Sequence, residues 1–194
     1  MSTAVPAPST AGLPLVPVSH PAITADLAYA TVRNFTGRVL YAEALALLRP
    51  EAARALYAAA GDFAAQGLRI ILLDAYRPVS VQRMLWAVRP DPDYVADPAV
   101  GSDHSRGTAV DLTLADANGV LDMGTDFDAA VVQSHHGRDD IAPEAIANRL
   151  ILRRGMEAAG FLTNPLEWWH YALPAQAGFS ILDDTAGALP VPVP

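Results

Sequence analysis

The sequence contains no cysteine, and this absence limits the chemistry that the chain can perform. Disulfide bonds and thiolate metal sites are excluded, because both need cysteine sulfur. Any metal ion must therefore be held by histidine, aspartate or glutamate side chains. That donor set suits zinc and other ions that accept nitrogen and oxygen ligands.

Clusters of basic residues are also missing. Thirteen Lys and Arg residues stand against 21 Asp and Glu residues, for a formal net charge of −8. Nucleic acids and anionic membrane surfaces attract clustered positive charge. We therefore expect neither as a partner, and the sequence does not indicate an oligomeric state.

No apolar stretch approaches the ~20 residues that a transmembrane helix needs. A secretory signal has a basic segment followed by an uninterrupted apolar one. The first twenty residues contain no Lys or Arg and are interrupted by Pro6, Pro8, Pro14 and Pro17. We therefore expect a cytoplasmic protein, with the periplasm as the alternative.

The chain does contain enough apolar residues for one domain. Of 194 residues, 52% are apolar, as in folded globular proteins with a sizeable core. Residues 1–22 and 183–194 are rich in proline and small residues and look extended, which predicts a poorly ordered arm or a segment wrapped on the surface at residues 1–22 and a similar tail at residues 183–194. We expect the domain to span residues 23–182.

The spacing of apolar residues predicts three helices and three strands. Helices are predicted over residues 50–67, 79–89 and 143–160, since apolar side chains recur there at helical spacing. Short apolar runs predict strands over residues 68–74, 108–114 and 168–173. Helices and strands do not alternate strictly, which favours an α+β domain over a doubly wound parallel sheet.

Asp111 lies inside the apolar strand predicted over residues 108–114. An unpaired buried carboxylate is costly, so Asp111 needs a partner. One interpretation is an ion pair with an arginine such as Arg106, and the other is a metal ion shared with His104. A continuous strand would direct residues seven apart to opposite faces, but a bend at Gly107 could bring the two side chains together. The spacing alone favours the ion pair.

Glu167 and His170 in the stretch EWWHY raise a similar question. Side chains three apart diverge on a regular strand and converge on a helical turn or a bulge. Taken alone, the stretch is more typical of an aromatic core strand. If His170 joined His104 and Asp111, three protein ligands would leave a fourth position for water, and Glu167 would act as the base for that water.

Arg77 follows a predicted buried strand directly, where Pro78 turns the chain. An arginine in that position can stabilise a developing oxyanion. It can also simply pair with Asp74, and for this residue alone the pairing is the more typical role.

Six stretches, in the same order along the chain, resemble the VanX-type D-alanyl-D-alanine dipeptidases, a group of LAS-type zinc peptidases with the Hedgehog fold. SDHSRGTAVD fits the signature S-x-H-x-x-G-x-A-x-D, and EWWHY fits E-x-x-H. The six stretches are DLAYATVRNFTG (26–37), DAYRP (74–78), SRGTAVDLTL (105–114), MGTDFD (123–128), SHH (134–136) and EWWHY (167–171). The resemblance covers roughly residues 23–173. It implies a single α+β domain with a mainly antiparallel central sheet and flanking helices.

The resemblance also implies a catalytic metal centre. One zinc ion would be bound by His104, Asp111 and His170. Glu167 would be the catalytic acid and base, and Arg77 would stabilise the transition state. The implied activity is hydrolysis of D-Ala-D-Ala to two D-alanines.

Three further residues would bind the small dipeptide substrate. By the same resemblance, Asp128 with Tyr29 nearby would receive its free amino end, and Ser102 would help to hold its carboxylate. His135 and His136 match the family's SHH, but two adjacent histidines cannot easily join the same ion, so we interpret them as structural or supporting residues.

The chain departs from the family pattern in one place, because the link between residues 86–100 and the zinc motif looks short; this region could shape the mouth of the pocket. Two other functions stay open. One is a zinc D,D-carboxypeptidase or endopeptidase of murein stem peptides, which would need export and an open cleft. The other is a zinc-stabilised binding module without activity, which would need neither Glu167 nor Arg77. The sequence does not distinguish glycopeptide resistance from recycling of D-alanine.

Overall fold

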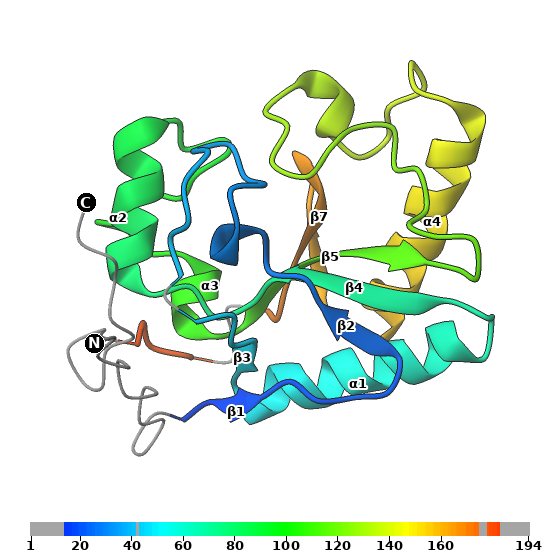
Figure 1. Ribbon diagram of the computed structural model, residues 1–194, viewed down its shortest axis with the longest axis horizontal. Helices are drawn as coiled ribbons and strands as arrows, with labels where there is room; N and C mark the ends of the chain where they lie inside the picture. Colours follow the sequence, from blue (N-terminus) through cyan, green and yellow to red (C-terminus); the bar gives the residue numbers. More distant parts are fainter. Residues whose placement is uncertain (1–13, 42, 175–177, 183–194) are drawn as a thin grey trace, which may run out of the picture.

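A five-stranded sheet and helices packed on it make up the fold in the computed structural model, which describes residues 14–41, 43–174 and 178–182 (Figure 1). The strand order is β2 (Ile23–Ala25), β4 (Arg69–Asp74), β5 (Ala109–Ala115), β7 (Glu167–Ala172) and β6 (Leu162–Asn164). The β2–β4 pair is parallel and the other three pairs are antiparallel. The predicted α+β class with a mainly antiparallel sheet is confirmed.

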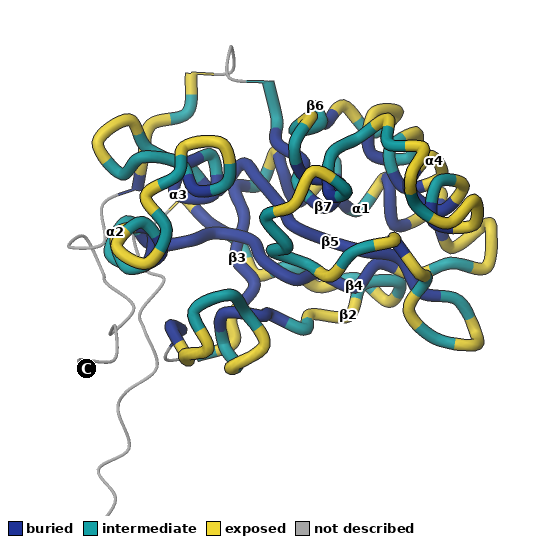
Figure 2. Tube along the Cα trace, turned by 90° about the horizontal axis from the view of Figure 1, so that it is seen from above, coloured by how far each residue is buried: buried dark blue, intermediate teal, exposed yellow. Residues whose placement is uncertain are grey.

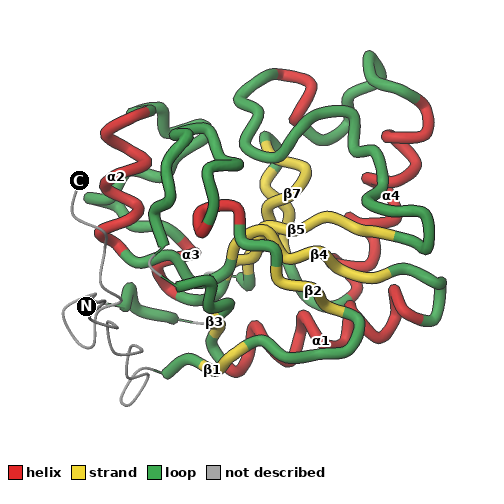
Figure 3. The backbone as a smooth tube through the Cα atoms, viewed as in Figure 1, coloured by secondary structure: helices red, strands yellow, loops and turns green. Residues whose placement is uncertain are grey.

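Three helices have ten or more residues among those described: α1 (Pro50–Ala64), α2 (Val79–Val88) and α4 (Pro143–Ala158). A single turn, α3 (Asp103–Arg106), precedes β5, and two 3-10 turns are η1 (Ala28–Ala30) and η2 (Val132–Ser134). Figure 3 shows that long loops connect these elements around the strands. No helix in the described part of the chain has the length and apolar character to cross a membrane.

The main core lies between the sheet and helices α1 and α4 (Figures 1 and 2). Val110, Leu112 and Leu114 of β5 are fully buried in this core, as the alternation along the predicted strand requires. The opposite face of β5 is also buried, and it carries Asp111. The strand thus holds a carboxylate on the face that the two large helices do not cover.

All six predicted elements are present, with helix ends a few residues earlier than expected. The elements that the sequence did not reveal are short: β1 (Val16–Pro17), β3 (Leu47–Leu48), β2, β6 and the single-turn helices. Residues 14–22, expected in the arm, pack along the domain, since β1 pairs with β3 and Leu15 is buried. Residues 1–13 and the predicted tail over 183–194 lie outside the described residues, so where the domain ends on either side stays a prediction.

Candidate active site

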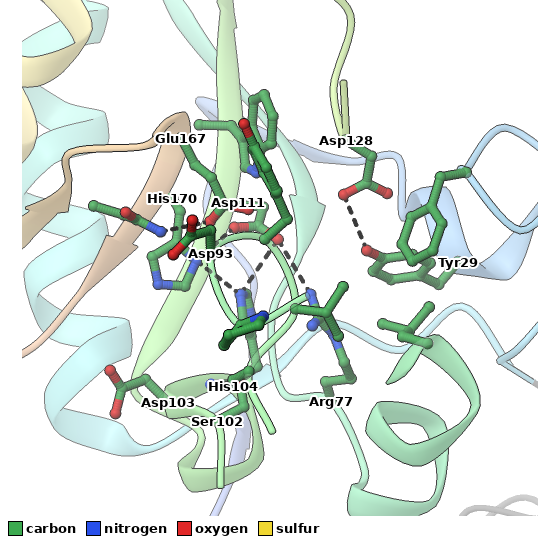
Figure 4. A pocket seen from close by; sticks show the side chains of 18 of the residues that line it. Tyr29, Arg77, Asp93, Ser102, Asp103, His104, Asp111, Asp128, Glu167 and His170 are labelled. Carbon is green, nitrogen blue, oxygen red and sulfur yellow. Dashed lines mark hydrogen bonds and ion pairs between the residues drawn. The ribbon is translucent and has the colours of Figure 1, made fainter. Parts of the chain in front are cut away.

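Two histidines and one aspartate converge at the end of the central strands (Figure 4). Nε2 of His104 lies 3.1 Å from Nδ1 of His170. Oδ1 of Asp111 lies 3.0 Å from Nδ1 of His170, and Oδ2 of Asp111 lies 3.3 Å from Nε2 of His104. His104 and Asp111 are buried, and His170 is partly buried.

The chain bends between His104 and Asp111, at the glycine that the metal interpretation had considered. Ser102 caps α3 by accepting a hydrogen bond from the backbone N–H of His104. Gly107 ends α3 in the left-handed conformation, with φ of 73°, before β5 begins. His170 lies opposite Asp111 in the pairing of β7 with β5. A turn and two adjacent strands therefore bring the three side chains together.

These three residues fit one zinc ion. Zinc bonds of about 2.0–2.2 Å at tetrahedral angles place ligand atoms about 3.3–3.6 Å apart, slightly more than the distances among these side chains. Nδ1 of His104 lies 2.7 Å from the carbonyl oxygen of Ala75, which can only accept, so the proton of His104 is on Nδ1 and the lone pair of Nε2 points into the cluster. A lone pair that faces a carboxylate and a second imidazole suits a bound cation.

Arg106 is not the partner of Asp111. Its side chain lies 3.5 Å from Asp103 and donates to the carbonyl of Phe179. The arginine beside Asp111 is Arg77, whose Nη2 lies 3.4 Å from Oδ2 of Asp111. The ion pair of Asp111 therefore involves Arg77 rather than Arg106, and it is present together with the cluster.

A bulge in β7 turns Glu167 and His170 into the same pocket. Tyr171 pairs with Thr163 and Glu167 pairs with Asn164, so four steps along β7 match one step along β6. Both Glu167 and His170 line the pocket that contains the cluster. Burial raises the pKa of Glu167 to about 7, while nearby His170 acts in the opposite direction. A carboxylate with that pKa can exchange protons near neutral pH.

Arg77 lines the pocket and is nearly fully buried (Figure 4). Its guanidinium donates to Asp74 at 2.9 Å and to Gln82 at 2.9 Å, and it stacks on the ring of Tyr29 at 4.9 Å. Both roles expected for Arg77 are therefore compatible, because the pairing with Asp74 holds the guanidinium against the pocket.

Asp128 lies across the pocket from Glu167, beside Tyr29 (Figure 4). Its Oδ1 accepts a hydrogen bond of 3.1 Å from the Tyr29 hydroxyl, whereas its buried Oδ2 has no partner among the described residues. Burial raises the pKa of Asp128 to about 8, with Asp111 acting in the same direction. Its φ of 62° is the one positive value of a non-glycine residue in the described chain. A strained, unpaired buried carboxylate is suited to a cationic ligand.

The pocket has a volume of about 170 Å³, below the range of about 300–1,000 Å³ typical of sites for drug-sized ligands. Ser102 is buried in its wall. Five consecutive residues of the loop after α2, from Pro92 to Ala96, form another part of the wall. Neither His135 nor His136 is among the described residues that line this pocket.

Sequence reasoning missed one residue that holds the site together, Asn164, and part of the role of another, Asp74. Asn164 donates a hydrogen bond of 2.7 Å to Oε2 of Glu167. Asp74 is fully buried, binds Arg77 and accepts a hydrogen bond of 2.6 Å from Tyr41. Asp74 was considered only as a partner for Arg77, and nothing in the sequence marked Asn164.

Known proteins similar to this chain are peptidases. The M15 peptidase family model described as D-Ala-D-Ala dipeptidase matches residues 9–192. The D-alanyl-D-alanine dipeptidase of Escherichia coli K12 is 44% identical over 168 residues, covering 86% of this chain and 87% of that protein. The D-alanyl-D-alanine dipeptidases of Enterococcus faecium and Streptomyces coelicolor are 35% and 34% identical, each over 76% of this chain and 84% of the relative.

Proposed function

The chain belongs to the D-Ala-D-Ala dipeptidase family of the M15 peptidases, and we propose that it hydrolyses the dipeptide D-Ala-D-Ala to two molecules of D-alanine, with one bound zinc ion. The observation that carries the proposal is a small pocket with a cluster of possible metal ligands at one side and the unpaired carboxylate oxygen of Asp128 at the other. A dipeptide with a free amino end can span that pocket.

We assign the zinc ligands to His104, Asp111 and His170, whose ligand atoms lie 3.0–3.3 Å apart. The chemistry that zinc supplies at a three-ligand site is acidification of a water and polarisation of a carbonyl. The other residues of the pocket then have to move protons, stabilise negative charge and hold the substrate.

Glu167 moves the protons in this proposal. Its carboxylate is buried, is held by Asn164 and lines the same pocket as the cluster. It takes the proton of the attacking water at one carboxylate oxygen and then passes it to the amine that leaves. Arg77, fixed by Asp74 and Gln82, places a positive charge against the pocket and stabilises the developing oxyanion.

Asp128 and Ser102 hold the two ends of the dipeptide. Oδ2 of Asp128 accepts the free ammonium group, with Tyr29 fixing the other carboxylate oxygen. The Ser102 hydroxyl, which already accepts a bond from the backbone of His104, donates its proton to the substrate carboxylate. An acylated substrate would leave the buried Asp128 carboxylate unpaired, which explains a preference for free dipeptides.

Glu167→Gln tests the assignment of acid–base and ligand roles. We expect the variant to bind one zinc ion per chain. Its kcat on D-Ala-D-Ala should fall by a factor of about 10²–10⁴, because proton transfer is removed while the ligand set stays intact. Metal content by mass spectrometry and release of D-alanine are the measurements. His170→Ala is the matched comparison, since it should lose both metal and activity.

Parallel loss of zinc and turnover in Glu167→Gln would contradict the acid–base role and make Glu167 a ligand. A variant that keeps full turnover would contradict the proposed mechanism altogether.

A further inference from the structure

We propose that Tyr94, which lines the pocket, and His135, which lies outside its lining, form a clasp that fixes one wall of the pocket and restricts the substrate to dipeptides. The Tyr94 hydroxyl and Nε2 of His135 share a hydrogen bond of 3.2 Å, and the centroids of the two rings lie 6.3 Å apart. This inference rests on the proposed function and assigns a specificity role to a histidine that the metal cluster does not use.

The clasp joins two loops that are 41 residues apart in sequence. Tyr94 lies in the loop between α2 and α3, which supplies Pro92–Ala96 to the pocket wall. His135 directly follows η2 in the long segment between β5 and α4, and the same segment carries Asp128. The bond therefore ties part of the pocket wall to the segment that carries Asp128.

The His135 side of the clasp is fixed to helix α4. Nη1 of Arg149 donates to the carbonyl oxygens of Gln133 and His135, at 2.8 Å and 3.1 Å. Nε of Arg149 donates to the carbonyl of Met123 at 2.6 Å, and the guanidinium lies over the ring of Trp168. Arg149 is itself buried, so the segment that presents His135 cannot move without breaking these bonds.

The Tyr94 side is fixed to the floor of the pocket. The side-chain amide of Gln82 donates to the carbonyl of Ala96 at 2.7 Å, and its oxygen accepts from Arg77. The neighbouring Val95 is buried in the core. One glutamine thus connects the loop of Tyr94 to the arginine beside the metal ligands.

In this proposal, a substrate longer than a dipeptide would have to displace the wall that the clasp holds. With a pocket of about 170 Å³, the hydrogen bond keeps that wall in place. Loss of the bond would make room for an additional residue. The rest of the pocket, including Asp128 and the metal ligands, would stay in place.

The test compares Tyr94→Phe, His135→Ala and the double variant, each zinc-loaded, on D-Ala-D-Ala and on D-Ala-D-Ala-D-Ala. We expect the ratio of kcat/KM for the tripeptide to that for the dipeptide to rise at least tenfold in each single variant, mainly through a lower KM for the tripeptide. The double variant should show no more than the larger single effect, because both changes remove the same bond.

Tyr57→Phe is the matched control. The Tyr57 hydroxyl accepts a hydrogen bond from the backbone N–H of Ser19 and donates one to the carbonyl of Pro17, and Tyr57 is not among the described residues that line the pocket, so its loss should leave the ratio unchanged. Hydrogen exchange of residues 90–101, measured by mass spectrometry, gives a readout independent of catalysis. Exchange should be faster in both clasp variants than in the wild type and in Tyr57→Phe.

An unchanged substrate ratio, or additive effects in the double variant, would overturn the specificity role. Unchanged exchange of residues 90–101 would overturn the clasp itself. A wild-type protein that does not cleave D-Ala-D-Ala would instead contradict the proposed function, and the exchange experiment would still decide whether the clasp exists.

Discussion

Asp128 combines three features that rarely occur together in one side chain. Its backbone is held at positive φ, its carboxylate is buried, and one of its oxygens has no partner among the described residues. Each of these costs free energy in the unliganded protein. The proposed ammonium group of the substrate would remove two of the three costs at once, by pairing the charge and satisfying the oxygen.

Asp128→Asn removes the charge and keeps the shape, and asparagine tolerates positive φ. We expect kcat/KM for D-Ala-D-Ala to fall about 10- to 150-fold, the loss of one hydrogen bond to a charged group. Activity on N-acetyl-D-Ala-D-Ala, which has no ammonium group, should change little. Steady-state kinetics on both substrates are the measurement, and equal losses on both would remove the amine-binding role.

At the scale of elements, two local irregularities build the site. The α3 turn ends at Gly107 and lets His104 face Asp111, and the bulge in β7 lets Glu167 face the side of His170. A Cβ atom at Gly107 would lie 2.7 Å from Cδ2 of Leu15 and 3.4 Å from the backbone of Arg49. Glycine is needed there both for its φ and for the close packing of neighbouring residues.

Gly107→Ala should therefore lower the free energy of unfolding by about 1–2 kcal/mol and also weaken zinc binding at least tenfold. Gly67→Ala is the control, because Gly67 has φ of 75° with open space around it and lies at the end of α1. It should lose similar stability and bind zinc as the wild type does. Chemical denaturation and chelator competition measure the two quantities, and equal zinc affinity in both variants would contradict the account.

The sequence predicted the long elements because their apolar periodicity is strong, and it missed those of two to four residues because no period develops over that length. The sequence offered a bend at Gly107 as a way to bring His104 and Asp111 together, and the structure has that bend. The hydrogen bond of Asn164 to Glu167 depends on the register of β6 against β7 around a bulge. Register of that kind is set by tertiary packing, so a single sequence does not reveal it.

At the scale of the whole molecule, one layer of helices supports the sheet from the face opposite the site. α1 and α4 pack on each other and on the strands, and the segment from η2 leads into α4. His136 lies in that segment, with its ring against Tyr171. Its Nε2 is shielded from solvent and has no partner among the described residues.

Burial lowers the pKa of His136 to about 4, and Arg153 and Arg149 act in the same direction, against Glu157. The native state therefore favours the neutral ring. The contribution of neutral His136 to the free energy of unfolding is fully present above the unfolded pKa of about 6.5 and is lost as the pH falls through about 4. We expect the wild type to lose about 1–2 kcal/mol more stability than His136→Gln between pH 6.5 and 4, after allowance for solvent screening. Urea denaturation across that range measures the difference, and parallel curves would exclude this role.

The central claim is that this chain is a zinc dipeptidase that recognises the free amino end of D-Ala-D-Ala. The most direct measurement is D-alanine release by the purified protein, with its metal content determined in the same preparation, from D-Ala-D-Ala, N-acetyl-D-Ala-D-Ala and L-Ala-D-Ala. We predict one zinc per chain, turnover of the free D,D-dipeptide that stops on chelation and returns with zinc, and far slower turnover of the other two. Equal turnover of the acetylated peptide, or turnover that survives loss of the metal, would contradict the account.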